Sequence, residues 1–337
     1  MGTKTKCKWT LTVKKLIIQI PCYNEEDTLG TALSALPREV PGIDKVEWLI
    51  IDDGSTDRTV EVAQNHGVEH IVKLPQHLGL AKGFMAGIKA CLDVGADIIV
   101  NTDADNQYNA DDITKLVEPI MKGEAEIVVG QRPISEINHF SFVKKLLQKI
   151  GSWAVRVASN TDIPDAASGF RAISREAAMR LNVFNNYTYT LETIIQAGQS
   201  GMAITSVPIR VNDDLRPSRL VKSIPSYVQR SIFTILRIFM TYRPFRFFLI
   251  PGLFSFGVGF IIGLRFFVLW LMGSGDGHVQ SLILAAILLG SGFLMILVGW
   301  LADLIAVNRM ILEELQYKIR KNEYKQKSRN HNRTSVK

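Results

Sequence analysis

The fold is decided by an apolar run that ends in two carboxylates, Ala96-Asp97-Ile98-Ile99-Val100-Asn101-Thr102-Asp103-Ala104-Asp105. Its β-branched residues predict a buried strand, and Asp103 and Asp105 lie where that strand must end. Neighbouring carboxylates repel each other, and a divalent cation or hydrogen-bond donors offset that repulsion. Alone, Asp-Ala-Asp is also typical of an ordinary acidic turn, so the rest of the chain has to decide between the two interpretations.

The sequence around this run alternates short β-rich segments with helical patterns. We expect strands over residues 16–20, 46–51, 68–73, 98–101 and 127–130, and helices over residues 25–36, 57–65, 82–92 and from Asp111 onward. Runs of Val and Ile separated by helices predict an α/β fold, with a doubly wound, mainly parallel sheet and helices on both faces. In such sheets, ligands bind at the carboxyl edge of the strands.

Two more polar clusters follow the first and second predicted strands. They are Pro21-Cys22-Tyr23-Asn24-Glu25-Glu26 and Asp52-Asp53-Gly54-Ser55-Thr56-Asp57. Each has a structural alternative, because Asn24 and Asp57 could cap the helices that follow them. Capping does not explain three polar clusters that converge on one crevice, so a nucleotide site is the better interpretation. No Gly-x-Gly-x-x-Gly follows the first strand, which argues against a dinucleotide-dependent oxidoreductase.

Hydrophobic residues make up 47% of the 337 residues and concentrate after Phe245. Residues 247–271 carry one charge, Arg265, and residues 279–302 carry none, so each stretch is long enough to span a bilayer. Arginines flank the pair on both sides, whereas the loop between them has no Lys or Arg. The positive-inside rule therefore predicts an integral membrane protein whose catalytic region and both termini are cytoplasmic. The alternative is a buried helical hairpin in a soluble protein.

The remaining segments are basic or amphipathic. Amphipathic helices are predicted over residues 142–158 and 223–240; the second is expected at the membrane interface, and the first either there or packed on the sheet. Residues 318–337 hold eight Lys and Arg against Glu323 alone, within a net charge of +7. Contact with anionic lipid and simple solvation both explain this tail. No nucleic-acid-binding signature is present, and three unclustered cysteines indicate neither disulfides nor a zinc site.

These observations give an expected organisation of the chain. It consists of a basic extension (residues 1–15), a catalytic domain (16–222), a juxtamembrane amphipathic helix (223–244), a transmembrane hairpin (245–307) and a basic tail (308–337). Within the first span, Ser255, Gly259 and Gly263 are spaced by four residues. Such a small-residue face favours either a tight hairpin or a homo-oligomer.

Four motifs together carry a resemblance to a known family. Pro21-x-Tyr23-Asn24-Glu25, Asp52-Asp53-Gly54-Ser55, Asp103-Ala104-Asp105 and Ser168-Gly169-Phe170-Arg171 resemble family 2 glycosyltransferases with the Rossmann-like GT-A fold. Within that family the chain is similar to polyprenyl-phosphate glycosyltransferases, including dolichol-phosphate mannose synthases. The resemblance implies inverting transfer of a hexose from a UDP- or GDP-linked sugar to a dolichyl or undecaprenyl phosphate at the cytoplasmic membrane face.

The resemblance also implies roles for individual residues. The nucleotide sugar would be bound by Pro21, Tyr23, Asn24, Glu25, Asp53, Lys82, Asp103 and Ala104. Mg²⁺ or Mn²⁺ would be held by Asp103, Asp105 and Gln107, whose oxygens are hard ligands. The acceptor phosphate would be bound by Arg132, Ser168, Arg216 and Arg219, and Asp165, Arg132 and Arg171 would be catalytic.

Asp165 has three possible roles at this stage. It matches the family's proposed base, but a phosphate monoester is already largely deprotonated at neutral pH and needs no base to attack. Asp165 would then orient other groups, or form a structural ion pair with Arg171.

Two other functions fit part of the pattern. A processive polysaccharide synthase shares the fold, but typically carries a Gln-x-x-Arg-Trp motif and more membrane spans than this sequence contains. A non-catalytic, membrane-tethered nucleotide-sugar-binding protein is the other, and the intact Asp103, Asp105 and Gln107 argue against it.

Overall fold

The computed structural model describes residues 15–133, 142–183, 189–212, 224–273 and 278–334. By its internal contacts the chain forms two compact units. The first, here called the α/β unit, comprises Met1–Ser231 together with Gln316–Lys337. The second, here called the hairpin unit, comprises Ile232–Leu315.

The α/β unit is built on a seven-stranded sheet in the order β3-β2-β1-β4-β6-β5-β7. The strands are β1 (Lys15–Cys22), β2 (Lys45–Asp52), β3 (His70–Lys73), β4 (Ile98–Asn101), β5 (Ile127–Gln131), β6 (Arg171–Ser174) and β7 (Ile204–Pro208). All neighbouring pairs are parallel except the two that β6 makes with β4 and β5. The predicted α/β fold with a mainly parallel sheet is confirmed, and β6 and β7 are additions to it.

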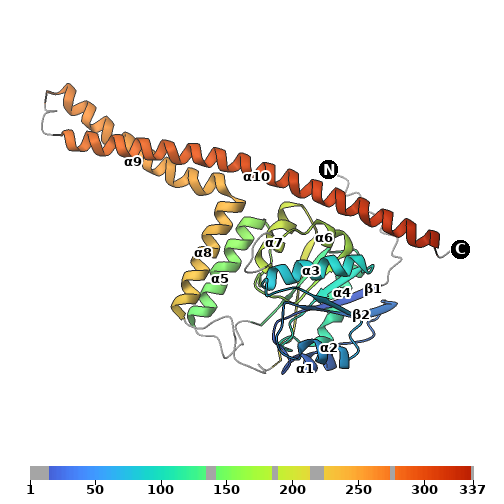
Figure 1. Ribbon diagram of the computed structural model, residues 1–337. Helices are drawn as coiled ribbons and strands as arrows, with labels where there is room; N and C mark the ends of the chain where they lie inside the picture. The colour runs from blue at the N-terminus through green and yellow to red at the C-terminus, as the bar shows by residue number, and fades with distance from the viewer. Residues whose placement is uncertain (1–14, 134–141, 184–188, 213–223, 274–277, 335–337) are drawn as a thin grey trace. The chain divides into compact units, whose positions relative to one another are not determined.

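Helices cover both faces of this sheet, and Figure 1 shows α3 and α6 on one side with α1 and α2 on the other. The helices of the unit are α1 (Leu29–Ala35), α2 (Thr59–Asn65), α3 (Leu80–Asp93), η1 (Ala110–Asp112), α4 (Ile113–Met121), α5 (Phe142–Ser159), α6 (Arg175–Arg180) and α7 (Thr190–Gln199). Alternation along β1 sends Leu16 and Ile18 into the core shared with α1 and α4. On the opposite face Gly87 lets α3 approach closely, because a Cβ there would lie 2.6 Å from Ile51 Cδ1.

The direction of β6 determines which residues meet at the carboxyl edge. Because β6 is antiparallel, its first residue, Arg171, pairs with Asn101 at the end of β4 and with Val129 near the end of β5. The Ser168-Gly169-Phe170-Arg171 motif therefore arrives at the same edge as the residues that follow β1, β2 and β4.

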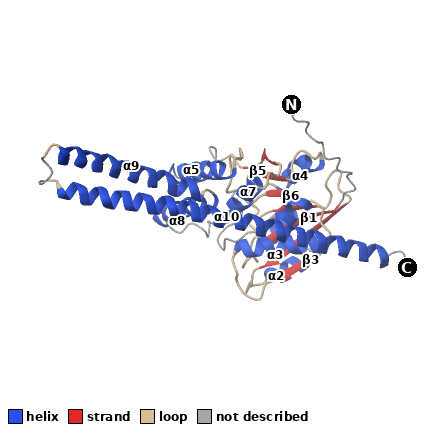
Figure 2. Ribbon diagram, turned by 90° about the horizontal axis from the view of Figure 1, so that it is seen from above, coloured by secondary structure: helices blue, strands red, loops and turns tan. Residues whose placement is uncertain are grey.

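In the hairpin unit, the first of two long helices packs against the beginning of the second (Figure 2). They are α9 (Pro244–Leu271) and α10 (Val279–Thr334), preceded by α8 (Ile224–Tyr242). Ser255 Oγ donates to the Leu288 carbonyl at 3.0 Å, and a Cβ at Gly259 would lie 2.9 Å from Leu289 N. The small-residue face predicted from the sequence is thus used within the hairpin.

Residues Pro244–Leu271 and Val279–Tyr324 form two helices that are long and apolar enough to cross a membrane. Their large apolar side chains are mostly exposed; Phe254 and Ile261, for example, are 74% and 68% exposed. A soluble protein would bury such side chains, so this exposure favours a lipid environment over the buried-hairpin alternative.

Beyond its apolar part, α10 continues as a helix through the segment expected to be a basic tail. Its residues from Gln316 belong to the α/β unit. There Lys321 Nζ lies 2.9 Å from Glu176 Oε1, and Arg320 donates to the Leu181 carbonyl at 2.8 Å. A cation at the carboxyl end of α6 is favourable because the last carbonyls of a helix carry partial negative charge.

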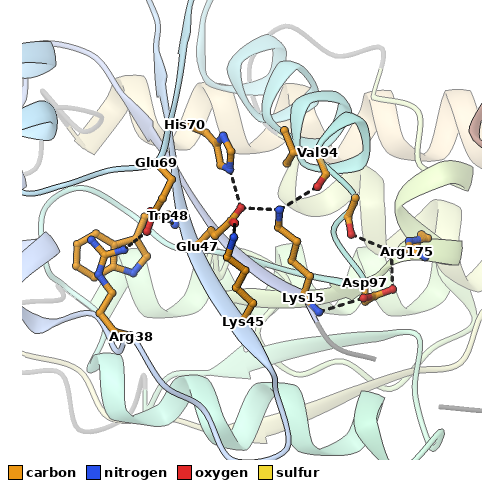
Figure 3. Close-up of polar contacts among 11 residues, drawn as sticks. Lys15, Arg38, Lys45, Glu47, Trp48, Glu69, His70, Val94, Asp97 and Arg175 are labelled. Carbon is orange, nitrogen blue, oxygen red and sulfur yellow. Dashed lines mark hydrogen bonds and ion pairs between the residues drawn. The ribbon is translucent and has the colours of Figure 1, made fainter. Parts of the chain in front are cut away.

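The amino edge of the sheet holds a buried carboxylate with three basic partners (Figure 3). Glu47 Oε2 lies 2.7 Å from Lys15 Nζ and 2.6 Å from His70 Nε2, and Glu47 Oε1 lies 2.6 Å from Lys45 Nζ. Burial by itself raises the pKa of Glu47, but hydrogen bonds from these three partners outweigh it and lower the pKa to about 2.

This depressed pKa predicts how stability depends on pH. A carboxyl with a pKa of 4.5 when unfolded and about 2 when folded stabilises the fold above pH 4.5, and the contribution disappears as the pH falls toward 2. Glu47→Gln should therefore lower the thermal unfolding temperature of the detergent-solubilised protein most at pH 7. The difference in unfolding temperature between wild type and variant, measured by circular dichroism, should become smaller below pH 4.5. A gap that stays constant from pH 7 to pH 3 would show that this ion cluster does not stabilise the protein.

Candidate functional site

The polar clusters predicted to converge do meet at the carboxyl edge of the sheet. Pro21, Tyr23, Asn24, Glu25, Asp53, Asp103 and Ala104 lie at or just beyond the ends of β1, β2 and β4, and Lys82 lies in the first turn of α3. The loops after β1 and β2 are tied together, since Asn24 N donates to Ser55 Oγ at 3.0 Å and Thr56 N donates to Asn24 Oδ1 at 2.8 Å. Asn24 thus joins the two loops, and Thr28 is the residue at the start of α1.

The Asp53 side chain binds the loop that precedes α3. Its carboxylate accepts hydrogen bonds from Leu78 N at 2.8 Å and Gly79 N at 2.9 Å, and it lies 2.8 Å from His77 Nδ1. The His77 ring stacks on Tyr23 with 3.9 Å between ring centroids. Asp53 therefore holds an aromatic pair at the rim of the site. No sequence pattern indicated His77, because its contact with Asp53 depends on how the loop before α3 folds back onto the end of β2.

Asp103 and Asp105 follow β4 and are both partly buried. Burial raises the pKa of Asp103, and the adjacent charge of Asp105 raises it further, to about 7. Gln107 N donates to Asp105 Oδ1 at 3.2 Å. The turn after β4 thus carries two carboxylates and one side-chain amide. Within the described ranges, no group of three or more His, Cys, Asp and Glu side chains is placed to hold a metal ion.

A glycine lets the Ser168–Arg171 segment lie directly against Asp103. A Cβ at Gly169 would be 3.2 Å from Asp103 Oδ1 and 3.0 Å from the Tyr189 hydroxyl. Gly169 N donates to the Tyr108 hydroxyl at 3.1 Å, and Asn101 Nδ2 donates to the Gly169 carbonyl at 3.0 Å. Tyr108, Tyr189 and Asn101 are thus part of the site, although isolated polar residues of this kind carry no sequence signature.

Arg132 and Asp165 form a buried ion pair beside this loop. Arg132 Nε and Nη2 donate to Asp165 Oδ2 and Oδ1 at 2.7 Å and 3.0 Å, and the two residues are 8% and 1% exposed. The structural pair considered from the sequence was with Arg171, whereas the structure joins Asp165 to Arg132. Both carboxylate oxygens are used, so Asp165 holds the guanidinium of Arg132 in a fixed orientation.

Arg171 is fully buried and supports the loop around it. Its guanidinium donates to Thr193 Oγ1 at 2.5 Å, to the Thr190 carbonyl at 3.1 Å and to the Ser168 carbonyl. Arg171 Nε and Ser168 Oγ are buried and have no hydrogen-bond partner among the described residues. Buried polar atoms are nearly always paired in folded proteins, so two orphaned atoms beside an ion pair make this loop a candidate for ligand binding.

Two of the arginines expected to bind the acceptor phosphate lie farther along the chain, after Arg210. Arg210 itself is bound to Asp112, with Arg210 Nη2 3.0 Å from Asp112 Oδ1. Arg216 and Arg219 lie outside the described residues, so their contact with the acceptor phosphate stays a prediction.

Comparisons with known proteins agree with this fold. The family model of glycosyl transferase family 2 matches residues 17–181. An uncharacterized glycosyltransferase of Mycobacterium tuberculosis is 30% identical over 194 residues, covering 57% of this chain and 83% of that protein. The UDP-N-acetylglucosamine–dolichyl-phosphate N-acetylglucosaminyltransferase of Methanococcus voltae is 28% identical over 218 residues, covering 58% of this chain and 85% of that enzyme.

Among solved structures, glucosyl-3-phosphoglycerate synthase from Mycobacterium tuberculosis is similar with a TM-score of 0.54 and 22% sequence identity, covering 67% of this chain and 79% of that chain. The same enzyme is also solved in complex with Mn²⁺, UDP and glucosyl-3-phosphoglycerate, with a TM-score of 0.51, 20% identity and coverage of 68% of this chain and 80% of that one. The strand order, the polar residues at the carboxyl edge and these matches agree. The chain therefore belongs to glycosyltransferase family 2 and has the GT-A fold.

Proposed function

We propose that this protein is an inverting, metal-dependent glycosyltransferase that moves a hexose from a UDP- or GDP-linked sugar to a polyprenyl phosphate at the cytoplasmic membrane face. One observation carries the proposal: Asp103 lies against a loop that carries orphaned buried donors, next to the Arg132–Asp165 ion pair. A site with carboxylates on one side and guanidinium groups on the other suits two phosphorylated substrates that meet at one sugar.

The carboxylate side fits a divalent cation. Two neighbouring carboxylates, one with a pKa raised to about 7, are stabilised when a cation offsets their repulsion. With the amide of Gln107 they form a hard oxygen donor set suited to Mg²⁺ or Mn²⁺, and such a cation would neutralise charge on the departing nucleoside diphosphate. The structural relative solved with Mn²⁺ and UDP makes that cation and that nucleotide the first to test.

The arginine side fits the acceptor phosphate. Asp165 binds the Nε–Nη2 edge of the planar Arg132 guanidinium, so the Nη1–Nη2 edge is the one that would donate to phosphate oxygens. The orphaned Ser168 Oγ adds a donor. A phosphate monoester with a second pKa of about 6 attacks without a base, so orienting Arg132 is the role of Asp165 that the geometry favours.

A lipid acceptor also needs apolar surface near the site. The α5 helix buries Ala154, Val155 and Ala158, yet its Leu146, Ile150, Trp153 and Val157 are 39–53% exposed. These four residues are spaced by four, three and four positions, so they form one apolar stripe. This stripe and the two apolar helices support an acceptor whose tail lies in a bilayer, and the relative from Methanococcus voltae is named for a dolichyl-phosphate acceptor.

A panel of donors tests the proposal. Membranes containing the protein are incubated with undecaprenyl or dolichyl phosphate and with radiolabelled UDP-glucose, UDP-galactose, UDP-N-acetylglucosamine or GDP-mannose, with and without EDTA. We expect one donor to label the organic extract, and EDTA to abolish that label. Transfer that persists in EDTA would contradict the metal, elongation of a glycan would favour a polysaccharide synthase, and donor binding without transfer would favour a non-catalytic protein.

A further inference from the structure

A four-residue stretch after β7 connects the two sides of the site. In this stretch, Ile209–Asn212, Ile209 N donates to the Gln131 carbonyl at 3.0 Å, directly before Arg132. Asn212 N donates to the Gln107 carbonyl at 2.9 Å. The stretch, here called the bridging segment, thus contacts both the strand end that carries Arg132 and the turn that carries Asp105 and Gln107.

The Asn212 side chain fixes the backbone of that turn. Asn212 Nδ2 donates to the Asn106 carbonyl at 2.9 Å and to the Tyr108 carbonyl at 3.3 Å. Together with the bond from its backbone N, Asn212 holds three consecutive carbonyls of residues 106–108. Asn106 has a φ of +55°, a left-handed conformation that costs free energy in a residue with a Cβ and needs such support.

The bridging segment that carries Asn212 is held in place by hydrogen bonds of its own, which Arg210 makes with Asp112 and Asn109. Arg210 N donates to Asp112 Oδ2 at 2.6 Å, and Asn109 N donates to the Arg210 carbonyl at 3.3 Å. The Asp112 side chain is fully buried. Burial by itself raises the pKa of Asp112, but hydrogen bonds from Arg210 and Lys115 lower it overall, so this anchor stays charged at neutral pH.

We infer that Asn212 is a positioning residue for the cation site: it sets the turn on which Asp105 and Gln107 are carried, without touching a substrate. The inference rests on the proposed function, because it assumes that these two side chains hold a cation. It concerns a residue outside the four motifs, and one that lies more than a hundred positions along the chain from the turn it holds.

The test measures binding of Mn²⁺ by electron paramagnetic resonance, with the full-length protein in detergent and with UDP or GDP present. Asn212→Leu has almost the same size but removes both side-chain donors, and we expect it to weaken Mn²⁺ binding about tenfold, the scale seen when a supporting residue of a metal site is lost. Asn212→Ser keeps one side-chain donor, so its affinity for Mn²⁺ should lie between the affinities of the wild type and Asn212→Leu. In transfer assays, the half-saturating concentration of Mn²⁺ should rise in Asn212→Leu, while the KM for polyprenyl phosphate changes less than twofold.

A matched control separates this role from general destabilisation. Asn182 is buried, and its Nδ2 likewise donates to a backbone carbonyl, that of Arg180 at 3.3 Å, but it follows α6 and lies away from the carboxyl edge. Asn182→Leu should lower the thermal unfolding temperature without changing Mn²⁺ binding. Equal loss of Mn²⁺ binding in both variants, or unchanged binding in Asn212→Leu, would overturn the inference. If the wild-type protein fails to bind Mn²⁺ in the presence of UDP and also in the presence of GDP, the proposed cation site itself is wrong.

Discussion

Asp105→Ala should lower the rate of sugar transfer by about a thousandfold, the scale reported for losing one preorganised charge-stabilising group. The remaining carboxylate, Asp103, would keep its place against Gly169, but the cation would lose one of its two charged ligands. Thermal stability should not fall, because the charge of Asp105 contributes to the raised pKa of Asp103 and its removal relieves repulsion. Initial rates with the preferred donor, together with the thermal unfolding temperature of both proteins, check this expectation.

A nearby carboxylate provides the control. The Asp111 side chain is 78% exposed and lies only six residues farther along the chain. Asp111→Ala should transfer sugar at close to the wild-type rate. Full activity in Asp105→Ala, or equal losses in both variants, would remove the basis for a cation at this position.

Arg132→Ala should lose both transfer and stability, because it leaves the Asp165 carboxylate buried without its partner. Removing one member of a buried ion pair typically costs about 3–5 kcal/mol of unfolding free energy. Urea unfolding in detergent measures that loss. The exposed pair of Lys122 and Glu118, 2.6 Å apart, is the matched control, and Lys122→Ala should leave the unfolding free energy essentially unchanged.

A double substitution separates the two roles of Arg132. Arg132→Met with Asp165→Leu replaces the ion pair by apolar side chains and should recover most of the stability that Arg132→Ala loses. Transfer should stay lost, because the acceptor phosphate still lacks its guanidinium. If the double variant transferred sugar at a substantial rate, the pair would be structural, and the acceptor site would have to be sought elsewhere.

The sequence predicted the parts of the fold that have local signals. Runs of Val and Ile marked the five strands from β1 to β5, and uniform apolar composition marked α9 and the first part of α10. The β6 strand, Arg-Ala-Ile-Ser, was missed because four residues without alternation carry no strand pattern, and only its neighbours β4 and β5 make it one. The helical continuation of α10 was missed because a run of Lys and Arg alone does not reveal contacts with α6.

In the candidate site, too, residues with a local sequence signal were predicted, and residues placed by tertiary contacts were not. The position of Asp103 and Asp105 just beyond a strand end was predictable, because they follow an apolar run. The partner of Asp165 was not, because Arg132 lies 33 positions away and the choice between Arg132 and Arg171 depends on how the loops pack. The holding roles of Tyr108, Tyr189 and Asn212 likewise come from tertiary contacts that no spacing encodes.

The mass of the lipid product tests the central claim most directly. The full-length protein in detergent is incubated with Mn²⁺, the preferred nucleotide sugar and undecaprenyl phosphate, and the organic extract is examined by mass spectrometry. The account predicts one new lipid, heavier than undecaprenyl phosphate by a single glycosyl residue, with nucleoside diphosphate as the released product. A lipid heavier by a glycosyl phosphate, with release of nucleoside monophosphate, or a ladder of longer glycans, would contradict it.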